Sequence, residues 1–483
     1  RSIPGCNEYS VIYWPGEPDL PMMRHRWKFL FTGLLITGCG TFYEVNYEFN
    51  KNFESGDLVS AERVLEENIK EERSKTRFLY YANRGVVTHL LGKYEESNQW
   101  LERAYIFGED YQKNYLTYAA SYFLNPNLIM YPGEDHEHLM LLYYKALNYL
   151  KLKDYEKALV ECRRLNNRLY ELGDKYTSKN KYRRDAFVHN LMGIVYDASG
   201  DYNNAFIAYR NSLEIYEQDY ARLFELKVPN QLKSDLMRTA YRSGFLEELK
   251  QYEDKFGYKY EKQPSDGGSL VFFWHNGLAP VKAQWSITFV ASGSGNGRVF
   301  FENASLGLSF PYDFDPDDYE ENFSITDLTG VRVAFPKYVE RVPYFDYGDL
   351  EANGQYYTLE KAEDINKIAF KTLNERMLEE LGKGLLRVAV KKAIEKQVRK
   401  ENEGLGFLVS ALNIASEQAD TRNWQTLPHS IHYTRVPLKE GKNTVEIYTD
   451  GPRSESSESF TFLGQKGQTQ FHSYQSLESQ VAF

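Results

Sequence analysis

The sequence has few cysteines and contains none of the common catalytic motifs. Three cysteines occur in 483 residues. The chain has no G-x-S-x-G, H-E-x-x-H, P-loop or C-x-x-C pattern, so it offers no nucleophile elbow, zinc-protease helix, phosphate loop or redox pair. The sequence therefore predicts no catalytic residue, no metal site and no cofactor.

The chain also lacks an excess of positive charge and a long apolar run. Its 58 Lys and Arg residues are outnumbered by 68 Asp and Glu residues, which gives a formal net charge of -10. Nucleic acids and acidic membrane surfaces bind basic patches, so we expect no nucleic-acid partner. No internal stretch has the apolar length of a membrane-spanning helix.

A secretory signal precedes the main part of the chain. Residues 22–28 are basic, residues 29–36 form a short apolar run, and small residues follow, which is the order found in signal peptides. The tetrapeptide ITGC that ends at Cys39 resembles the bacterial lipobox, whose cysteine is alkylated with diacylglycerol and becomes the new amino terminus. We expect a lipidated Cys39, a signal peptide at 22–38 and mis-assigned upstream sequence at 1–21. An ordinary signal peptide with a coincidental cysteine is the alternative.

The lipobox resemblance also implies a location. Gly40 follows the lipidated cysteine at a place where Asp would resemble an inner-membrane retention signal. The resemblance therefore implies an outer-membrane lipoprotein of the bacterial cell envelope that faces the periplasm. With Cys6 upstream and Cys39 acylated, Cys162 has no partner for a disulfide in the mature chain, and we interpret it as a small buried hydrophobe.

The stretch Ala186–Tyr216 has the pattern of two short helices joined by a turn at residues 200–202. Gly193 and Ala205 are small where the two helices approach closely, and tyrosines fill the space between them. The pattern resembles the tetratricopeptide repeat (TPR), a helix–turn–helix unit of about 34 residues. Similar turns near residues 56, 92, 153 and 244 predict further copies, so we expect an all-α TPR-like solenoid over residues 39–258.

A solenoid presents an extended groove that usually holds a peptide or a partner protein. We predict a protein partner for this groove, bound by tyrosines of the repeats and by the basic run from Lys175 to Arg184. A solvated turn is the alternative interpretation of the basic run. The predicted partner-binding residues are Tyr149, Tyr196, Tyr209, Lys179 and Arg183.

The composition changes after residue 258. Residues 259–268 have the polar, Pro-containing and Gly-paired composition of a linker, and Ser269–His275 has the pattern of a buried strand. Few contacts are expected to cross this linker, so that each half folds alone. We expect an α+β domain at 269–453, a helical insertion at 358–416 with a break at Gly382-Lys383-Gly384, and a polar C-terminal tail at 454–483. The predicted fold class is mixed: an N-terminal all-α TPR-like solenoid, then an α+β domain with a long helical insertion.

Two segments of the second half are similar to a known family. The segments NGLAPVK, at 276–282, and ADTRNWQTLP, at 419–428, resemble a family of bacterial TPR-containing envelope lipoproteins. The resemblance covers nearly all of the mature chain and supplies no catalytic residues. Some members lie beside lipoprotein activators of cell-wall synthases, which implies a role in the envelope.

A candidate C-terminal site lies in and near these segments. Its residues are Asp420, Arg422, Trp424 and His275. Asp420 and Arg422 are close enough in sequence to pair around a packed Trp424, which favours a structural role for them over a binding site.

Two functions are compatible with these patterns. The first is a lipid-anchored, non-enzymatic scaffold or adaptor that binds another protein in envelope assembly or maintenance. The second is an enzyme or ligand-binding protein with a site between the C-terminal sheet and the 358–416 helices. An enclosed pocket with convergent polar side chains at that junction favours the second function, and a filled junction favours the scaffold.

Overall fold

The computed structural model describes residues 46–115, 129–175, 182, 184–262, 266–293, 298–313, 331–401, 418–452 and 454–481. Contacts join residues 40–483 into one compact unit. The signal peptide, Cys39, Lys179 and Arg183 lie outside the described residues. No helix in the described ranges combines the length and the apolar character that crossing a membrane requires.

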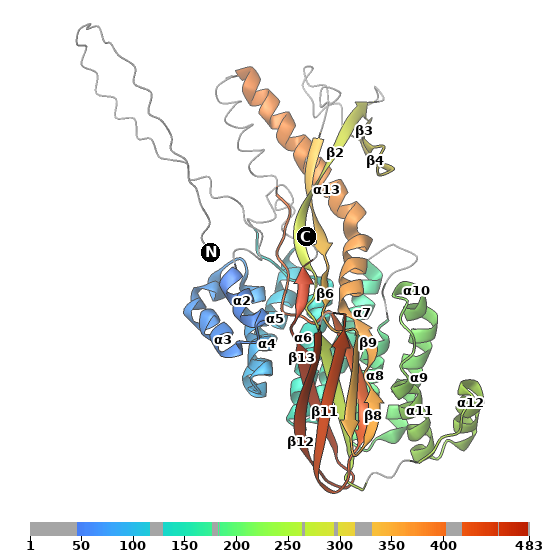
Figure 1. The fold of residues 1–483 in the computed structure, drawn as a ribbon. Helices are drawn as coiled ribbons and strands as arrows, with labels where there is room; N and C mark the ends of the chain where they lie inside the picture. The colour runs from blue at the N-terminus through green and yellow to red at the C-terminus, as the bar shows by residue number, and fades with distance from the viewer. Residues whose placement is uncertain are drawn as a thin grey trace, which may run out of the picture. The chain divides into compact units, whose positions relative to one another are not determined.

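The first half of the described chain consists of paired helices, drawn in blue to green in Figure 1. Each pair is joined by a tight turn with one residue of positive φ, at Gly56, Gly92, Lys153, Gly200 and Gly244. These turns fall where the sequence predicts them, and the TPR-like solenoid is confirmed. The pairs are α2 (Tyr47–Glu54) with α3 (Leu58–Glu67), α4 (Arg77–Leu90) with α5 (Tyr94–Tyr115), α6 (Asp135–Lys151) with α7 (Tyr155–Lys175), α8 (Ala186–Ala198) with α9 (Tyr202–Ile215), and α11 (Asn230–Ser243) with α12 (Leu246–Phe256). Three short helical segments connect them: η1 (Ile69–Arg73), η4 (Tyr216–Tyr220) and α10 (Ala221–Leu223).

The pair α8 and α9 shows why the small residues matter. Asp201 caps α9 by accepting a hydrogen bond from the backbone N–H of Asn204 at 3.1 Å. The Tyr209 ring lies so close to Gly193 that a Cβ added there would be 2.4 Å from a ring carbon. Ala205 is fully buried in the same contact. The two helices can therefore approach only because these positions carry almost no side chain.

Two four-stranded sheets pack face to face in the second half and form a sandwich. The sheet nearer the helices has the strand order β13-β1-β10-β9 and is called the inner sheet; the outer sheet has the order β12-β11-β7-β8. The strands of the inner sheet are β1 (Ser269–Asn276), β9 (Glu360–Asp364), β10 (Ser430–Pro437) and β13 (Thr469–Ser476). The strands of the outer sheet are β7 (Tyr347–Ala352), β8 (Gln355–Thr358), β11 (Gly441–Gly451) and β12 (Ser454–Gly464).

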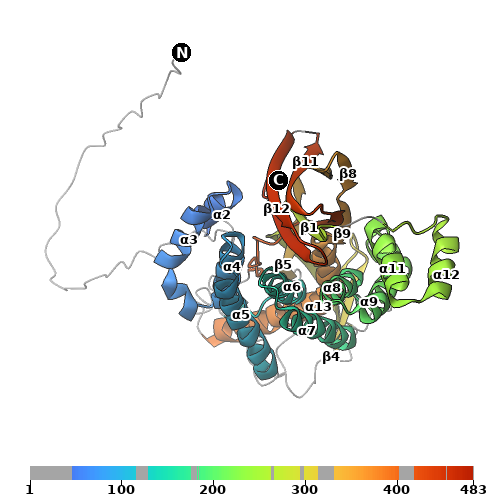
Figure 2. The same cartoon turned by 90° about the horizontal axis from the view of Figure 1, so that it is seen from below.

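Strand β1 is the centre of this arrangement because both of its faces are buried. Leu270, Phe272 and Trp274 point to the outer sheet and join its apolar core, while Val271 and Phe273 join the core of the helices. Alternate side chains of a strand point to opposite faces, so β1 holds three layers together: helices, inner sheet and outer sheet. Figure 2 shows the outer sheet on the side of the sandwich that faces away from the helices.

A third sheet and a long helix form an arm beside the sandwich (Figure 1). The arm sheet has the order β4-β3-β2-β5, and it packs against helix α13 through a separate apolar core that includes Phe289, Val333 and Leu385. The arm elements are β2 (Val281–Gly293), β3 (Arg298–Asn303), β4 (Leu308–Asp313), β5 (Val331–Val339) and α13 (Ile365–Glu401). A small pair of strands, β6 (Arg341–Pro343) and β14 (Ser479–Val481), completes the fold.

The helical insertion differs from the prediction in two ways. It begins at Ile365, because β8 and β9 occupy most of residues 355–364. It also runs without the predicted break at Gly382-Lys383-Gly384. Glycine inside a helix costs only about 1 kcal/mol relative to alanine, and the buried side chains of Leu381 and Leu385 hold this turn of the helix against the arm sheet. The Tyr312 hydroxyl also donates a hydrogen bond to the Gly382 carbonyl.

The predicted domain boundaries need two further corrections. The polar segment after residue 453 is not a tail, since it supplies β12, β13 and β14, and β13 pairs in parallel with β1 along its whole length. The two halves are not independent either, because one apolar core runs from the helices into β1 and β10. Backbone pairing needs no apolar side chains, so a pattern of apolar residues does not predict the Ser- and Gln-rich strands.

Candidate functional site

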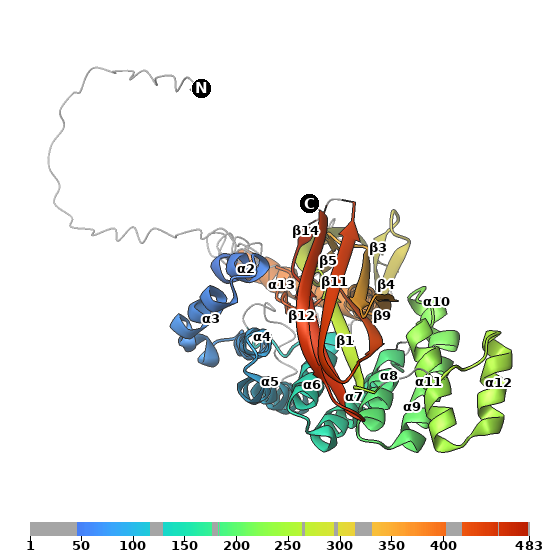
Figure 3. The ribbon, with the colours of Figure 1, turned by 60° about the horizontal axis from the view of Figure 1, so that its bottom comes forward.

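The chain's own inner sheet fills the concave side of the solenoid, where a partner was expected (Figure 3). Apolar contacts make up the centre of this junction, and the first helix of every pair adds a hydrogen bond to the second half. These bonds are Asn50 Nδ2 to Gln425 Oε1 (2.9 Å), Thr426 Oγ1 to Asn83 Oδ1 (3.0 Å), Tyr143 Oη with His275 Nε2 (2.9 Å), Tyr433 Oη to Asn190 Oδ1 (3.3 Å) and Arg435 N to Gln231 Oε1 (3.2 Å). The groove is therefore occupied in cis from α2 to α11.

The predicted partner-binding tyrosines lie in different environments. Tyr209 is fully buried, and its hydroxyl accepts a hydrogen bond from Arg435 at 3.4 Å. The prediction for Tyr209 is therefore wrong: its ring is part of the junction within the chain. Tyr149 and Tyr196 are partly exposed, and Arg163 donates to the Tyr196 hydroxyl at 3.3 Å. Lys179 and Arg183 lie outside the described residues.

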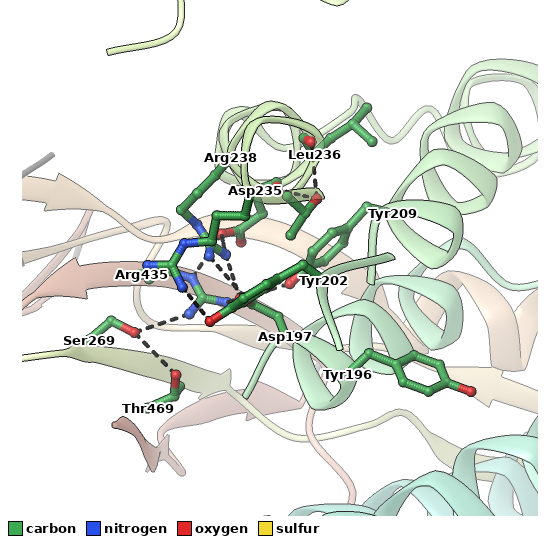
Figure 4. A network of polar contacts seen from close by, with 12 residues as sticks. Tyr196, Asp197, Tyr202, Tyr209, Asp235, Leu236, Arg238, Ser269, Arg435 and Thr469 are labelled. Atoms are coloured by element: carbon green, nitrogen blue, oxygen red, sulfur yellow. Dashed lines mark hydrogen bonds and ion pairs between the residues drawn. The ribbon is translucent and has the colours of Figure 1, made fainter. Parts of the chain in front are cut away.

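A buried cluster of two aspartates and two arginines fastens α8 and α11 to strand β10 (Figure 4). Arg435 of β10 contacts Asp197 of α8 at 2.7 Å and Asp235 of α11 at 2.8 Å. Arg238 contacts the same two carboxylates, at 2.9 Å to Asp197 Oδ1 and 2.7 Å to Asp235 Oδ1. Burial alone would raise the pKa of Asp197, but the guanidinium groups of Arg238 and Arg435 lower this pKa to about 2. We call these four residues the Asp–Arg cluster.

A second set of buried charges lies at the amino-terminal end of α6. Glu134 forms ion pairs with Lys282 of β2 and with Arg376 of α13, so it links the solenoid to the arm. These two cations lower the pKa of Glu134 against the opposing effect of burial. Glu137 accepts hydrogen bonds from the Tyr131 hydroxyl at 2.8 Å and from the Trp424 backbone N–H at 2.6 Å. Burial, and then the charge of Glu134, raise the pKa of Glu137 to about 7.

The four residues of the candidate C-terminal site are all buried or nearly so. Asp420 and Arg422 form a fork of two hydrogen bonds, each 2.8 Å long, and Arg422 also donates to the Ile129 carbonyl at 3.0 Å. Trp424 is 1% exposed and donates from Nε1 to Thr426. His275 contacts Tyr143, and burial lowers its pKa to about 3. The four side chains thus bind other parts of the chain, and the pairing of Asp420 with Arg422 agrees with the structural interpretation.

The junction encloses a small cavity beside two carboxyl groups. Its volume is ≈ 30 Å³, which is room for about one water molecule. Asp185 and Glu363 form part of its wall, and the rest is mainly aliphatic and aromatic. The Tyr220 hydroxyl donates to Glu363 at 3.0 Å, and the Tyr182 hydroxyl donates to Asp185. Burial, and then the charge of Asp185, raise the pKa of Glu363 well above its ordinary value.

Nothing in the sequence predicts that these charged groups are partners of one another. Asp185 precedes α8 and Glu363 lies in β9. Glu134 precedes α6, Lys282 lies in β2 and Arg376 lies in α13. A Lys in the strand Val281–Gly293 and an Arg in the strand Ser430–Pro437 are the only sequence signals, since charges in buried strands need partners. The cavity beside Asp185 and Glu363 has room for about one water molecule and is too small for a small-molecule ligand.

Comparisons with known proteins give a likeness of fold only. No protein-family model and no curated protein matches the chain. Among solved structures, BtubC (BKLC) from P. vanneervenii is 15% identical over 45% of this chain and 82% of its own, with a TM-score of 0.30. The apo form of RapI is 16% identical over 44% and 68%, with a TM-score of 0.32. MamA is 14% identical over 44% and 97%, with a TM-score of 0.28. We transfer no function from similarities at this level.

Proposed function

We propose that this protein is a lipid-anchored, periplasm-facing scaffold that binds another protein during assembly or maintenance of the bacterial cell envelope. The observation that carries the proposal is the filled junction between the solenoid and the sandwich. Where a ligand-binding protein would have a pocket, the described chain has ion pairs, packed aromatic rings and a cavity of ≈ 30 Å³. Instead, the solenoid and the sandwich form one joined body with extended outer surfaces, and such surfaces suit the binding of other proteins.

The anchor is Cys39, on the resemblance of its tetrapeptide to the lipobox. Two acyl chains on glycerol and one on the amino terminus bury enough CH₂ groups, at about 0.8 kcal/mol each, for stable attachment. Helix α2 begins at Tyr47, eight residues after Cys39 in the sequence. Extended chain spans at most about 3.6 Å per residue, so the folded body is held within roughly 30 Å of the bilayer.

The partner binds an outer surface, because the concave side is occupied by the inner sheet. Tyr149 and Tyr196 remain candidates, since both are partly exposed on the solenoid. Lys179 and Arg183 belong to a basic run between α7 and α8 and remain candidates on sequence grounds. Gly40 after the lipidated cysteine supports sorting to the outer membrane.

The test uses the full chain in intact bacteria. Labelled palmitate should enter the wild type and a Cys162→Ala variant, and it should not enter Cys39→Ser. Chemical crosslinking of intact envelopes, followed by purification, should recover the same partner proteins from the wild type and from Cys162→Ala. If the Cys39→Ser variant still takes up palmitate, the proposed lipid anchor at Cys39 is wrong. If the wild-type chain crosslinks to no protein, the proposed scaffold function is wrong.

A further inference from the structure

The outer face of the outer sheet combines exposed aromatic rings with several carboxylates. Tyr347 is 72% exposed and Tyr356 is 69% exposed, and the Tyr448 ring lies on strand β11 of the same sheet, with its centroid 6.4 Å from that of Tyr356. Soluble proteins normally bury such rings or place them at binding surfaces. The same face presents the carboxylates of Asp349, Glu351, Glu446, Asp450 and Glu455.

These carboxylates lie close enough to repel one another. Glu351 and Glu446 lie directly opposite each other on β7 and β11, an arrangement that destabilises a sheet. Across the described part of the chain, neither of them, nor Asp349, is in an ion pair with Lys or Arg, whereas many carboxylates of the solenoid surface are. Glu446 and Glu351 also raise the pKa of the exposed Tyr448 to about 12. The described side chains of this face therefore carry more negative than positive charge.

An open strand edge borders this face. Strand β12 ends the outer sheet and pairs with β11 over eleven consecutive residues without a bulge. Its outward edge pairs with no strand in the described ranges. Natural edge strands are usually short, or they carry Lys, Pro or a bulge that prevents further pairing. Strand β12 has no Lys, Pro or bulge, although it carries the charged residues Glu455 and Glu458. The short side chains of Ser457 and Ser459 leave Tyr448 and Glu446 uncovered on the next strand.

We propose that an extended, Lys- or Arg-bearing segment of a partner protein adds to the free edge of β12 and directs its cationic side chains over the acidic and aromatic face of the outer sheet. Main-chain pairing along the edge supplies affinity, and alternate side chains supply specificity. Glu446 of β11 neutralises the cations, and the ring of Tyr448 on the same strand receives them by cation–π contact. This inference rests on the proposed function, and it names the surface and the chemistry of the partner.

The experiment titrates the purified full chain with a fluorescent ten-residue peptide of alternating Lys and Thr. Two control peptides accompany it: one has Gln in place of Lys, and the other keeps every Lys but has all backbone amides N-methylated, so that it has no N–H donor on either edge. We expect the Lys–Thr peptide to bind, both controls to bind about tenfold more weakly or not at all, and 0.5 M salt to weaken the complex.

Protein variants locate the site. The double variant E351Q/E446Q should bind the Lys–Thr peptide about tenfold more weakly, while E247Q/E248Q, which removes the same charge from helix α12, should bind like the wild type. E351Q/E446Q should be at least as stable as the wild type in urea, since it removes a repulsion. An unchanged far-ultraviolet circular dichroism spectrum would show that the variant is folded, so that a loss of binding is not due to unfolding.

Several results overturn the inference. Equal binding of the normal and N-methylated peptides excludes strand addition, and equal binding by E351Q/E446Q and the wild type excludes this face. Self-association through β12, seen by sedimentation, would show that a second copy of the chain occupies this edge. Preferential binding of a neutral oligosaccharide would show that the surface binds sugars. In both cases the proposed cationic segment is not the occupant. These results leave the envelope crosslinking test untouched. Conversely, peptide binding by a chain that crosslinks to no envelope protein would count against the scaffold and not against this surface.

Discussion

Single residues in the Asp–Arg cluster decide how firmly the solenoid holds the sandwich. Four charges share a space that is almost closed to water, and each carboxylate contacts both guanidinium groups. Such an arrangement adds little net stability compared with apolar residues of the same volume, but removing one member leaves the others buried without compensation. The cluster thereby favours one position of α8 and α11 along strand β10 over other positions.

We expect Arg435→Leu to lower the free energy of unfolding by about 3–5 kcal/mol. Asp197 and Asp235 then keep Arg238 as their shared cation and lose the connection to β10. Urea denaturation followed by circular dichroism measures the change. Arg184→Ala is the control, because Arg184 contacts Glu214 and Asp219 near the surface and such pairs contribute about 1 kcal/mol or less. Equal losses in the two variants would falsify the assignment of the cluster.

Buried histidines make the fold sensitive to acid. Burial lowers the pKa of His89 and His136 to about 4 and that of His275, His432 and His472 to about 3. The unfolded histidines bind protons near pH 6.5, so their contribution to stability is complete above pH 6.5 and is lost as the pH falls towards 4. The raised pKa values of Glu137 and Glu363 act in the opposite sense, because these neutral carboxyls favour the fold at low pH.

The five histidines outnumber the two carboxyl groups, so stability should fall on acidification from pH 7 to pH 5. The measurement is the urea midpoint of the wild type at the two pH values, with the slope of the transition compared as well. We expect a lower midpoint at pH 5 by an amount equivalent to a few kcal/mol, at about 1.4 kcal/mol per proton and pH unit. A midpoint that rises on acidification shows that the carboxyl groups dominate.

Among the structural elements, the helix pair α8–α9 depends on close approach. Gly193→Ala places a Cβ 2.4 Å from the Tyr209 ring, and this ring cannot move away freely because it is fully buried and hydrogen-bonded to Arg435. We expect a loss of about 1–3 kcal/mol, the usual cost of overpacking a core. Thermal or urea denaturation measures it.

Ser199→Ala is the control for this variant, since Ser199 is exposed at the end of the same helix and donates only to the Tyr196 carbonyl. Exposed substitutions of this kind change stability by about 0.5 kcal/mol or less. If Gly193→Ala proves as stable as Ser199→Ala, the close contact between α8 and α9 is not present in solution.

For the whole molecule, the joint core predicts that the halves depend on each other. The solenoid alone would expose the rings that pack on the inner sheet, including Tyr143 and Phe187. Residues 1–262 and 263–483, expressed together as separate chains, should form a one-to-one complex that purifies through a tag on either one. Each fragment alone should aggregate or bind a hydrophobic dye. Two fragments that elute separately and unfold cooperatively would restore the prediction of independent domains.

The residue pattern by itself determined the solenoid. Its turns at Gly56, Gly92, Gly200 and Gly244 need backbone conformations that glycine favours, and small residues such as Gly193 mark close helix contacts, so both signals are local. The buried strand Ser269–His275 was predicted for the same reason, because a run of apolar residues between turns indicates a buried strand without reference to other parts of the chain. The Asp420–Arg422 pair is equally local, since its members are two residues apart.

Tertiary structure alone decided what covers the solenoid and which charges meet. Arg435 looks like any strand residue until β10 lies beside α8 and α11, and Lys282 has no visible partner until Glu134 and Arg376 reach it from two other elements. Strands β12 and β13 were missed because most of their side chains are polar, and their few apolar residues, such as Phe460, Phe462 and Phe471, are only partly buried. They pair with β11 and β1 through backbone hydrogen bonds. Long-range pairing is a property of the assembled chain, and for that reason the groove that the sequence predicts for a partner is filled by the chain itself.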